Sequence, residues 1–235
     1  MGSRIGGNLA VKRKFNLLGI GLLLFVICAA VAIKVAAVDR PAQPMADRPA
    51  AKVLPAVGEY KIDSDHSFAY FGARHHVVGL VRGRFDKVTG TINVAQDPAA
   101  CTVDVSIEIS SLSTQNTERD DDLRSSEYFD VKKFPTMTYH GRGVRRVSGT
   151  SWVMDGSLTM HGVTKVVPLT FNFSGAFTDI KPGRPARVAF HATAGVKRAE
   201  FGMGARDNLD ELGILTTPDV AIEIDVEADA ASPAQ

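Results

Sequence analysis

The segment VAIEIDVEA, residues 220–228, decides the fold of this chain, because apolar and acidic side chains alternate along it. Val220, Ile222, Ile224 and Val226 fall on one face, and three acidic residues fall on the other. Successive side chains of a strand point to opposite faces of a sheet, so this period of two predicts a strand with one buried and one solvated face.

The same alternation recurs from Gly58 onward. In CTVDVSIEI, residues 101–109, every second side chain is again a branched apolar one. Similar runs are SFAYFGARH, VRGRFDKVTGTINV with a turn expected near Thr89–Gly90, TMTYHGRG, SWVMDGSLTM, VVPLTFNFSGAF and ARVAFHATA. Turn signals at Asp97–Pro98, Gly149, His161–Gly162 and residues 181–183 separate them. We predict an all-β domain over residues 58–228, with about eight antiparallel strands that close into a barrel with an apolar inner face.

A polar segment, SLSTQNTERDDDLRSSEYFD at residues 111–130, interrupts the strand pattern. Asn116 or Thr117 is a candidate N-cap, and Asp120 precedes Arg124 by one helical turn. We therefore predict a short helix between two strands, and residues 206–212 give a second, weaker helical signal.

The three aspartates that begin at Asp120 point in three directions on a helix. No histidine or glutamate stands at the spacing that would complete a metal site with them. We expect these aspartates to be solvated, and we expect no metal and no cofactor.

Charge and cysteine content exclude several classes of protein. Residues 1–38 hold five of the 27 basic residues and none of the 26 acidic ones, so the remaining body has more acids than bases. A mildly acidic body argues against nucleic-acid binding. Cys28 lies in an apolar run and Cys101 stands alone, so neither an internal disulfide nor a cysteine-based metal site is expected.

The N-terminal region predicts export. A basic segment, residues 1–14, precedes an apolar segment at 15–37 that contains 19 uncharged residues from Phe15 to Ile33. This length suits a transmembrane helix with its basic flank in the cytoplasm. A proline- and alanine-rich linker follows at 38–57, which favours a retained anchor over a cleaved signal peptide. We expect a periplasmic or other extracytoplasmic domain anchored to the inner membrane, with a disordered tail at 229–235.

Several separated motifs resemble the YceI-like family of polyisoprenoid-binding, or lipid-binding, domains. They are YKIDSDHSFAYFGARH, GRFDKVTGTI, TERDDDLRSSEYFDVKKFP, DGSLTMHGVTKVVPL and VKRAEFGM, in this order. The resemblance covers roughly residues 58–228. It implies a lipocalin-like extended antiparallel β-barrel, typically exported, that encloses a long isoprenoid chain or a similar amphiphile and has no catalytic activity.

Candidate ligand-binding residues are of two kinds. His75, Arg119 and Arg124 match the family motifs and are candidates to bind a phosphate or quinone oxygen, although a structural histidine and an Asp120–Arg124 helix pair are equally ordinary roles. The apolar candidates are expected to line the barrel, where core and pocket wall are one surface: Phe68, Tyr70, Leu123, Phe129, Trp152, Phe171, Phe173 and Phe190. The His161–Gly162 pair is explained by a tight hairpin turn.

The leading functional hypothesis is non-enzymatic carriage or storage of an isoprenoid lipid or isoprenoid quinone. One alternative is an exported hydrolase that uses His75 or His76 with an acid such as Asp120. Against it, the chain lacks the G-x-S-x-G and H-E-x-x-H motifs and a Cys–His candidate. A second alternative is an envelope interaction protein whose barrel is filled by its own side chains.

Overall fold

The computed structural model describes residues 55–75, 78–177, 185–204 and 216–231. The predicted segments at 1–14 and 15–37, most of the linker at 38–57, His76 and the helical signal at 206–212 lie outside these residues. Within the described residues, no helix is both long enough and apolar enough to cross a membrane.

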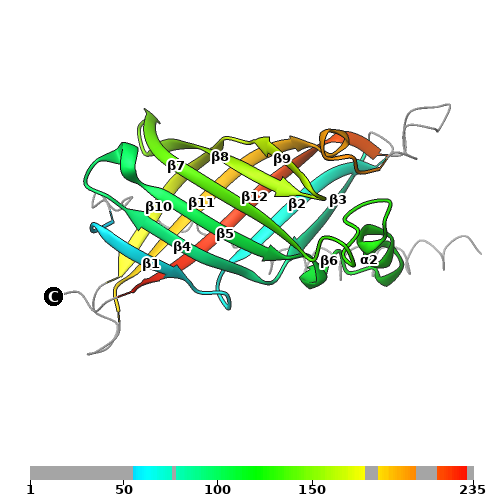
Figure 1. Cartoon of the computed structure of the whole chain (residues 1–235), viewed down its shortest axis with the longest axis horizontal. Coiled ribbons are helices and arrows are strands. Elements are labelled where there is room, and N and C mark those ends of the chain that lie inside the picture. Colours follow the sequence, from blue (N-terminus) through cyan, green and yellow to red (C-terminus); the bar gives the residue numbers. More distant parts are fainter. Residues whose placement is uncertain (1–54, 76–77, 178–184, 205–215, 232–235) are drawn as a thin grey trace, which may run out of the picture. The chain divides into compact units, whose positions relative to one another are not determined.

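The described chain forms a closed antiparallel barrel of eight long strands with one short α-helix (Figure 1), so the predicted fold class is confirmed for this part of the chain. The strand segments are β1 (Gly58–Ile62), β2 (Phe68–His75), β3 (Gly79–Phe85), β4 (Val88–Val94), β5 (Thr102–Glu108), β6 (Leu112–Ser113), β7 (Thr136–Ser148), β8 (Ser151–Met160), β9 (Val163–Val166), β10 (Leu169–Phe177), β11 (Arg187–Lys197) and β12 (Thr216–Ala230). Segments such as β1 and β2, or β3 and β4, follow one another in the barrel wall and act as one bent strand.

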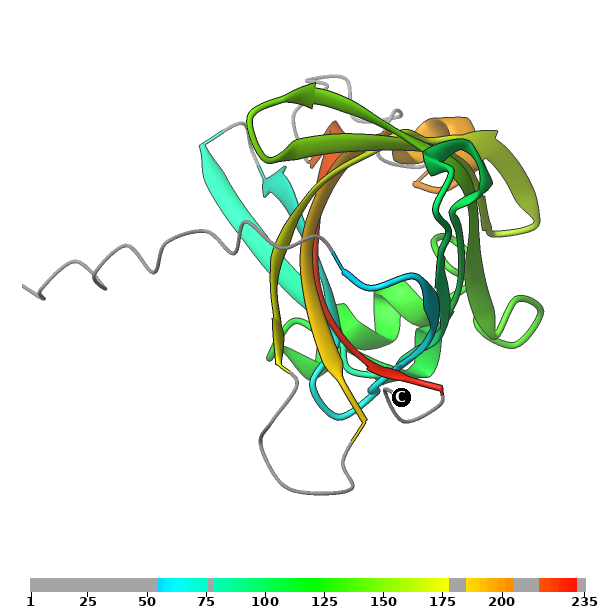
Figure 2. The ribbon, with the colours of Figure 1, turned by 90° about the vertical axis from the view of Figure 1, so that its left-hand side faces the viewer.

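Strand β12 closes the barrel. One edge pairs with β11 along nearly its whole length, from Arg187↔Asp229 to Lys197↔Asp219. The other edge pairs with β1 near its C-terminal end and with β2 further back. Figure 2 looks along the barrel and shows the strands as a ring, with α2 at the far end. Because β12 continues to Ala230, the ordered wall extends past residue 228, and the predicted tail begins too early.

The turn expected at Thr89–Gly90 is wrong. Strand β4 runs through both residues, and the break lies at Asp86–Lys87 instead. Gly90 has a φ of 148°, and a Cβ atom there would lie 2.0 Å from the carbonyl oxygen of Asp104 on β5. This glycine therefore permits a close approach of two strand backbones, which the sequence does not distinguish from a turn.

The turn prediction at His161–Gly162 is confirmed. Both residues have positive φ values, 52° and 74°, as a two-residue type I′ hairpin turn requires. The turn joins β8 to β9, and the Nδ1 atom of His161 lies 2.9 Å from the carbonyl oxygen of Phe201. This contact fixes the short 3₁₀ helix η3 (Arg198–Phe201) beside the turn.

The predicted helix is α2, Thr117–Arg124. Asn116 is its N-cap, and its side chain accepts a hydrogen bond from the backbone N–H of Arg119 at 3.0 Å. Two further 3₁₀ turns, η1 (Pro98–Ala100) and η2 (Ile109–Ser111), flank β5.

Candidate ligand-binding cavity

The barrel encloses a cavity of about 880 Å³ that extends from one end of the barrel to the other. The alternating residues of β5 and β12 supply two of its walls, with Val103, Val105 and Ile107 from β5 and the four apolar residues of VAIEIDVEA from β12. The acidic residues between them point to the outside of the barrel. The period of two thus produces both the apolar interior and the solvated exterior.

Aromatic rings cover the cavity wall in two groups. Phe190 packs against Phe171 and Phe173, with ring centroids 6.2 and 5.4 Å apart. Near α2, Phe85 packs against Phe71 and Phe129, at 5.5 and 5.6 Å. Rings at these separations pack edge-on or tilted and form rigid apolar surfaces.

Polar lining residues gather at the two ends of the cavity. At the α2 end they are His75, Asn116, Glu118, Arg119, Asp122 and Arg198, of which Arg198 is 9% exposed. At the other end they are Asn93, Gln96 and Thr102. An apolar middle with polar ends suits a long molecule with an apolar chain.

Arg119 and Asp120 are tied together through Thr114. The Nε and Nη2 atoms of Arg119 donate to the hydroxyl and carbonyl oxygens of Thr114 at 2.8 and 3.0 Å. The backbone N–H and the hydroxyl of Thr114 in turn donate to Oδ1 of Asp120 at 2.8 and 2.5 Å. This network fastens α2 to the end of β6.

The expectation of three solvated aspartates is therefore wrong for Asp120, which is only 7% exposed, and right for Asp121 and Asp122. Burial of a carboxylate requires hydrogen-bond donors, and Thr114 supplies two. The expected Asp120–Arg124 pair is also wrong: Arg124 lies 3.5 Å from Asp121 and donates to the carbonyl oxygens of Ser110 and Leu112.

The structure brings nine of the eleven predicted ligand-binding residues to the cavity wall. These are Tyr70, His75, Arg119, Leu123, Phe129, Trp152, Phe171, Phe173 and Phe190. Tyr70 only borders the cavity, because its ring packs against Phe68, with centroids 6.2 Å apart, on the outward face of β2. The wall does not include Phe68 or Arg124. Phe68 lies beneath the guanidinium group of Arg84, at 5.1 Å, and Arg124 makes the backbone contacts described above.

Sequence reasoning missed several lining residues. Phe71 and Phe85 belong to the aromatic group near α2, and the methionines Met137, Met154 and Met160 line the β7–β8 side. Alternation along β2 from the buried Ala69 would have selected Phe71 in place of Phe68. The methionines give no comparable signal, because methionine fills any apolar gap.

The ring of Tyr139 packs directly over Gly141 and Gly156, where the absence of side chains leaves room for it. Its hydroxyl donates to the carbonyl oxygen of Val167 at 3.0 Å, and burial together with the charge of Asp155 raises the pKa of this phenol to about 12. A Cβ atom on Gly156 would lie 2.3 Å from the phenol ring. Gly156 is thus a packing requirement of the cavity wall.

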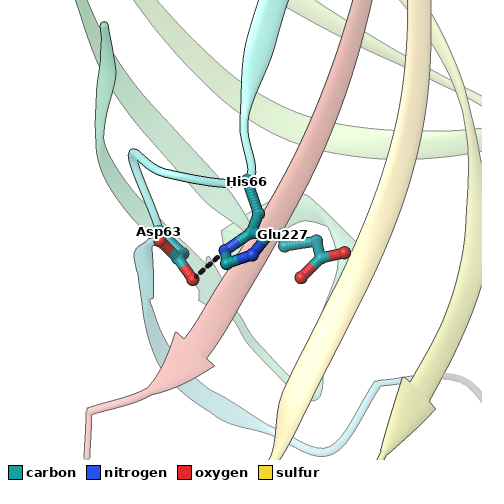
Figure 3. A group of neighbouring side chains, drawn as sticks. All are labelled: Asp63, His66 and Glu227. Atoms are coloured by element: carbon teal, nitrogen blue, oxygen red, sulfur yellow. Dashed lines mark hydrogen bonds and ion pairs between the residues drawn. The ribbon is translucent and has the colours of Figure 1, made fainter.

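A cluster of charges lies on the outside of the barrel where β1, β2, β11 and β12 meet. Asp63, His66 and Glu227 offer ligand atoms within 4.8 Å of one another (Figure 3), and Asp63 lies 2.9 Å from Nδ1 of His66. Arg187 donates to the carboxylates of Asp63 and Glu227 at 2.7 and 2.8 Å, and it also donates to the carboxylate of Asp229. The guanidinium group already supplies the positive charge that these carboxylates need, so we interpret the cluster as a structural ion-pair network.

Two pKa values reflect this network. Burial raises the pKa of Asp63, but the hydrogen bonds from His66 and the Asp65 N–H and the charge of Arg187 outweigh burial, so the pKa lies below its ordinary value. The hydrogen bond to Asp229 raises the pKa of Arg187. The buried Ser67 also connects the start of β2 to β12. Its hydroxyl donates to the carbonyl oxygen of Glu227 and accepts from the N–H of Glu227, both at 3.1 Å.

A closed eight-stranded antiparallel barrel around an apolar cavity defines the class of lipocalin-like barrels. Within this class the chain belongs to the YceI-like domain family, whose profile matches residues 60–228.

Comparison with individual proteins agrees with this assignment. The chain is 34% identical to the protein YceI of Salmonella newport over 148 residues, which is 62% of this chain and 76% of the relative. Two solved structures share the fold. BcnA of Burkholderia cenocepacia has a TM-score of 0.62 at 17% identity, over 71% of this chain and 98% of that one. A polyisoprenoid binding domain from Saccharophagus degradans, implicated in plant cell wall breakdown, has a TM-score of 0.56 at 19% identity, over 73% and 98%.

Proposed function

We propose that the barrel binds the chain of an isoprenoid lipid or isoprenoid quinone, without catalysing a reaction on it, and that it carries or stores this molecule on the extracytoplasmic face of a membrane. The observation that carries the proposal is the cavity itself, which is apolar along its length and polar only at its ends. The name of the Saccharophagus relative, a polyisoprenoid binding domain, supports the same class of ligand.

The length of the barrel favours an extended chain over a compact ligand. Strand β12 has 15 residues. A strand of this size is about 50 Å long, and at a typical barrel tilt it spans roughly 38 Å along the axis. An extended hydrocarbon chain that follows the axis therefore stays in contact with apolar side chains from end to end.

Tail burial supplies most of the affinity in this proposal. Each buried CH₂ group contributes about 0.8 kcal/mol, so a chain of several isoprene units exceeds the contribution of an exposed ion pair, which is about 0 to 1 kcal/mol. Of the three predicted head-group residues, His75 and Arg119 lie in the cavity wall, and Arg119 is held in place by Thr114. The head group then adjusts the orientation of the ligand more than its affinity.

The alternative of a hydrolase loses one of its candidate groups. Oδ1 of Asp120 accepts two hydrogen bonds from Thr114, which gives this carboxylate a structural role. The alternative of a filled barrel is opposed by the cavity of about 880 Å³, which the side chains of the described residues leave open.

Mass spectrometry of an organic extract of the purified protein tests the proposal directly. We expect a co-purifying isoprenoid lipid or quinone, and an extract with no lipid, from protein that also fails to take up added lipid, would refute the proposal. Two variants locate the ligand. Phe171→Asp places a charge in the cavity wall, whereas Thr170→Asp places the same charge at the exposed neighbouring position of β10.

We expect Phe171→Asp to abolish lipid binding and Thr170→Asp to preserve it, because an unpaired charge in an apolar cavity is strongly unfavourable. Since Phe171→Asp risks unfolding, Ala194→Phe serves as a second variant that fills part of the cavity without adding charge. A folded Ala194→Phe protein that binds lipid as well as the parent would contradict a ligand position inside the barrel.

A further inference from the structure

The β7–β8 hairpin lies at the end of the barrel opposite α2 (Figure 1). Arg142, Arg145 and Arg146 are exposed, and Val147 at the tip is 55% exposed. The end of the hairpin, residues 143–154, contains Arg145 and Arg146 and no aspartate or glutamate, in a body where acids outnumber bases, whereas Arg142 lies opposite Asp155 in the β7–β8 pairing. Positive charge beside exposed apolar side chains is the pattern that binds anionic lipid head groups.

The tip of the hairpin extends beyond its neighbour in the sheet. Strand β5 pairs with β7 only as far as Thr102↔Arg142, so the edge from Val144 to Ser148 has no further strand partner in the described part of the chain. Arg146 donates to the carbonyl oxygen of Gly149 across the turn, and its guanidinium lies 6.0 Å from the Trp152 ring. The tip is thus a projecting turn held by its own side chains.

The same end of the barrel is a mouth of the cavity. Val144 and Trp152 from the hairpin line the cavity, together with Pro55 and Val57. Val57 is 66% exposed while it also lines the cavity, so the cavity reaches the surface at this point. A surface that meets this end of the barrel therefore meets the cavity mouth.

The described chain begins at Pro55, which lines the cavity at this end of the barrel, and residues 1–54 precede it in the sequence. Those residues include the apolar segment 15–37, which the sequence predicts to span a membrane. The α2 end is less suitable for an anionic surface, because Glu118, Asp121 and Asp122 are exposed there.

We propose that the β7–β8 hairpin docks on an anionic phospholipid bilayer and holds this cavity mouth against the membrane. The inference rests on the proposed function only for the identity of the cargo. With the mouth against the bilayer, the apolar chain of a lipid passes between membrane and cavity without full exposure to water. Anionic head groups interact with Arg145, while Val147 enters the boundary between head groups and acyl chains.

Flotation with lipid vesicles tests the docking surface. Residues 55–235 are used for this test, because they contain all of the barrel strands and omit the apolar segment 15–37, which would bind vesicles by itself. The same fold makes up 98% of the matched BcnA chain, which supports folding of the barrel without a further domain. The vesicles contain phosphatidylcholine alone or phosphatidylcholine with phosphatidylglycerol. We expect binding to the anionic vesicles only, with a decrease as salt is added.

Two substitutions at the hairpin have matched controls at the opposite end. Val147→Asp should lower partitioning about tenfold or more. Arg145→Gln should lower it about fivefold, the factor that corresponds to about 1 kcal/mol per basic residue at an anionic surface. Val78→Asp and Arg82→Gln alter an exposed valine and an exposed arginine on the β2–β3 hairpin and should leave partitioning unchanged.

Each other outcome overturns the inference. These outcomes are no binding to either kind of vesicle, equal binding to both kinds, or an equal loss in the control variants. Because Val147 and Arg145 are exposed, urea unfolding midpoints should match the parent, which separates a lost surface from a lost fold. Lipid content measured on the same proteins keeps the two proposals apart: a protein that binds lipid but not vesicles retains the proposed function and loses the docking surface.

Discussion

Replacement of Asp120 by alanine should destabilise the barrel far more than replacement of the neighbouring Asp122. The carboxylate of Asp120 accepts two hydrogen bonds from Thr114, and both residues are 7% exposed. Hydrogen bonds to a charged group contribute about 1.5 to 3 kcal/mol each, and a buried N–H left without an acceptor costs about 1 to 3 kcal/mol. These effects overlap, so we expect Asp120→Ala to lower the free energy of unfolding by about 2 to 4 kcal/mol.

Urea denaturation followed by tryptophan fluorescence measures this loss, since Trp152 is the single tryptophan of the chain and lies in the cavity wall. Asp122→Ala is the matched control, because it makes the same change at an exposed position of the same helix. The control should stay within about 0.5 kcal/mol of the parent. An unchanged m-value would show that the loss lies in stability and not in the extent of unfolding.

A double-mutant cycle with Thr114→Val isolates the hydroxyl–carboxylate hydrogen bond. The valine keeps the backbone N–H and removes the hydroxyl, which donates to Asp120 and accepts from Nε of Arg119. The loss at Arg119 is common to both legs of the cycle and cancels, so the coupling energy between the two sites should be about 1 to 3 kcal/mol. If Asp120→Ala were as stable as Asp122→Ala, or if the coupling energy were zero, the burial and bonding of Asp120 would not stabilise the attachment of α2.

Three further predictions concern the barrel wall and the ion-pair network around Arg187. Gly156→Ala should cost about 1 to 3 kcal/mol in urea unfolding, because the new methyl group overlaps the Tyr139 ring; an unchanged midpoint would show that the ring has room to move. Burial raises the pKa of Tyr139 to about 12, so stability should be complete below pH 10 and fall by about 2 to 3 kcal/mol as the pH rises toward 12; Tyr139→Phe should remove this fall, and a variant with the same alkaline profile as the parent would exclude Tyr139 as its source. The pKa of Asp63 is lowered, so its contribution is complete above about pH 4 and is lost as the pH falls further; the difference in unfolding free energy between the parent and Asp63→Asn should shrink over that acid range, and a constant difference would contradict the ion pair with Arg187.

Most strands could be predicted from the sequence because they have one apolar face toward the cavity and one polar face toward solvent. The alternation in β5 and β12 places their valines and isoleucines in the cavity wall without any knowledge of neighbouring strands. Strand β2 lacks this contrast, since Phe68 and Phe71 fall on opposite faces and both are aromatic. Only the partners across the sheet determine that Phe71 packs on Phe85 inside while Phe68 lies beneath Arg84 outside.

Burial of Asp120 could not be predicted for a related reason. Its donors come from Thr114, which lies before the helix, and the run of three aspartates gives no sign of which one turns toward that residue. The position of the break in the long strand β3–β4 was also hidden, because Gly90 serves a close backbone approach and not a turn. Local sequence therefore predicts the elements well and the contacts between distant elements poorly.

The hydrogen bonds between Ser67 and Glu227 have a consequence for the order of folding. Ser67 bonds Glu227 across 160 residues of sequence, and the last strand of the chain supplies the partner for both β1 and β2. The barrel wall therefore cannot close until the C-terminal strand is available. Contacts over such separations form slowly, in the range of milliseconds to seconds for all-β domains, because the loop between them must be ordered first. Until then the edges of β1, β2 and β11 that face β12 are unpaired and the apolar inner face is accessible, so the proposed lipid ligand has access to the interior before the wall closes.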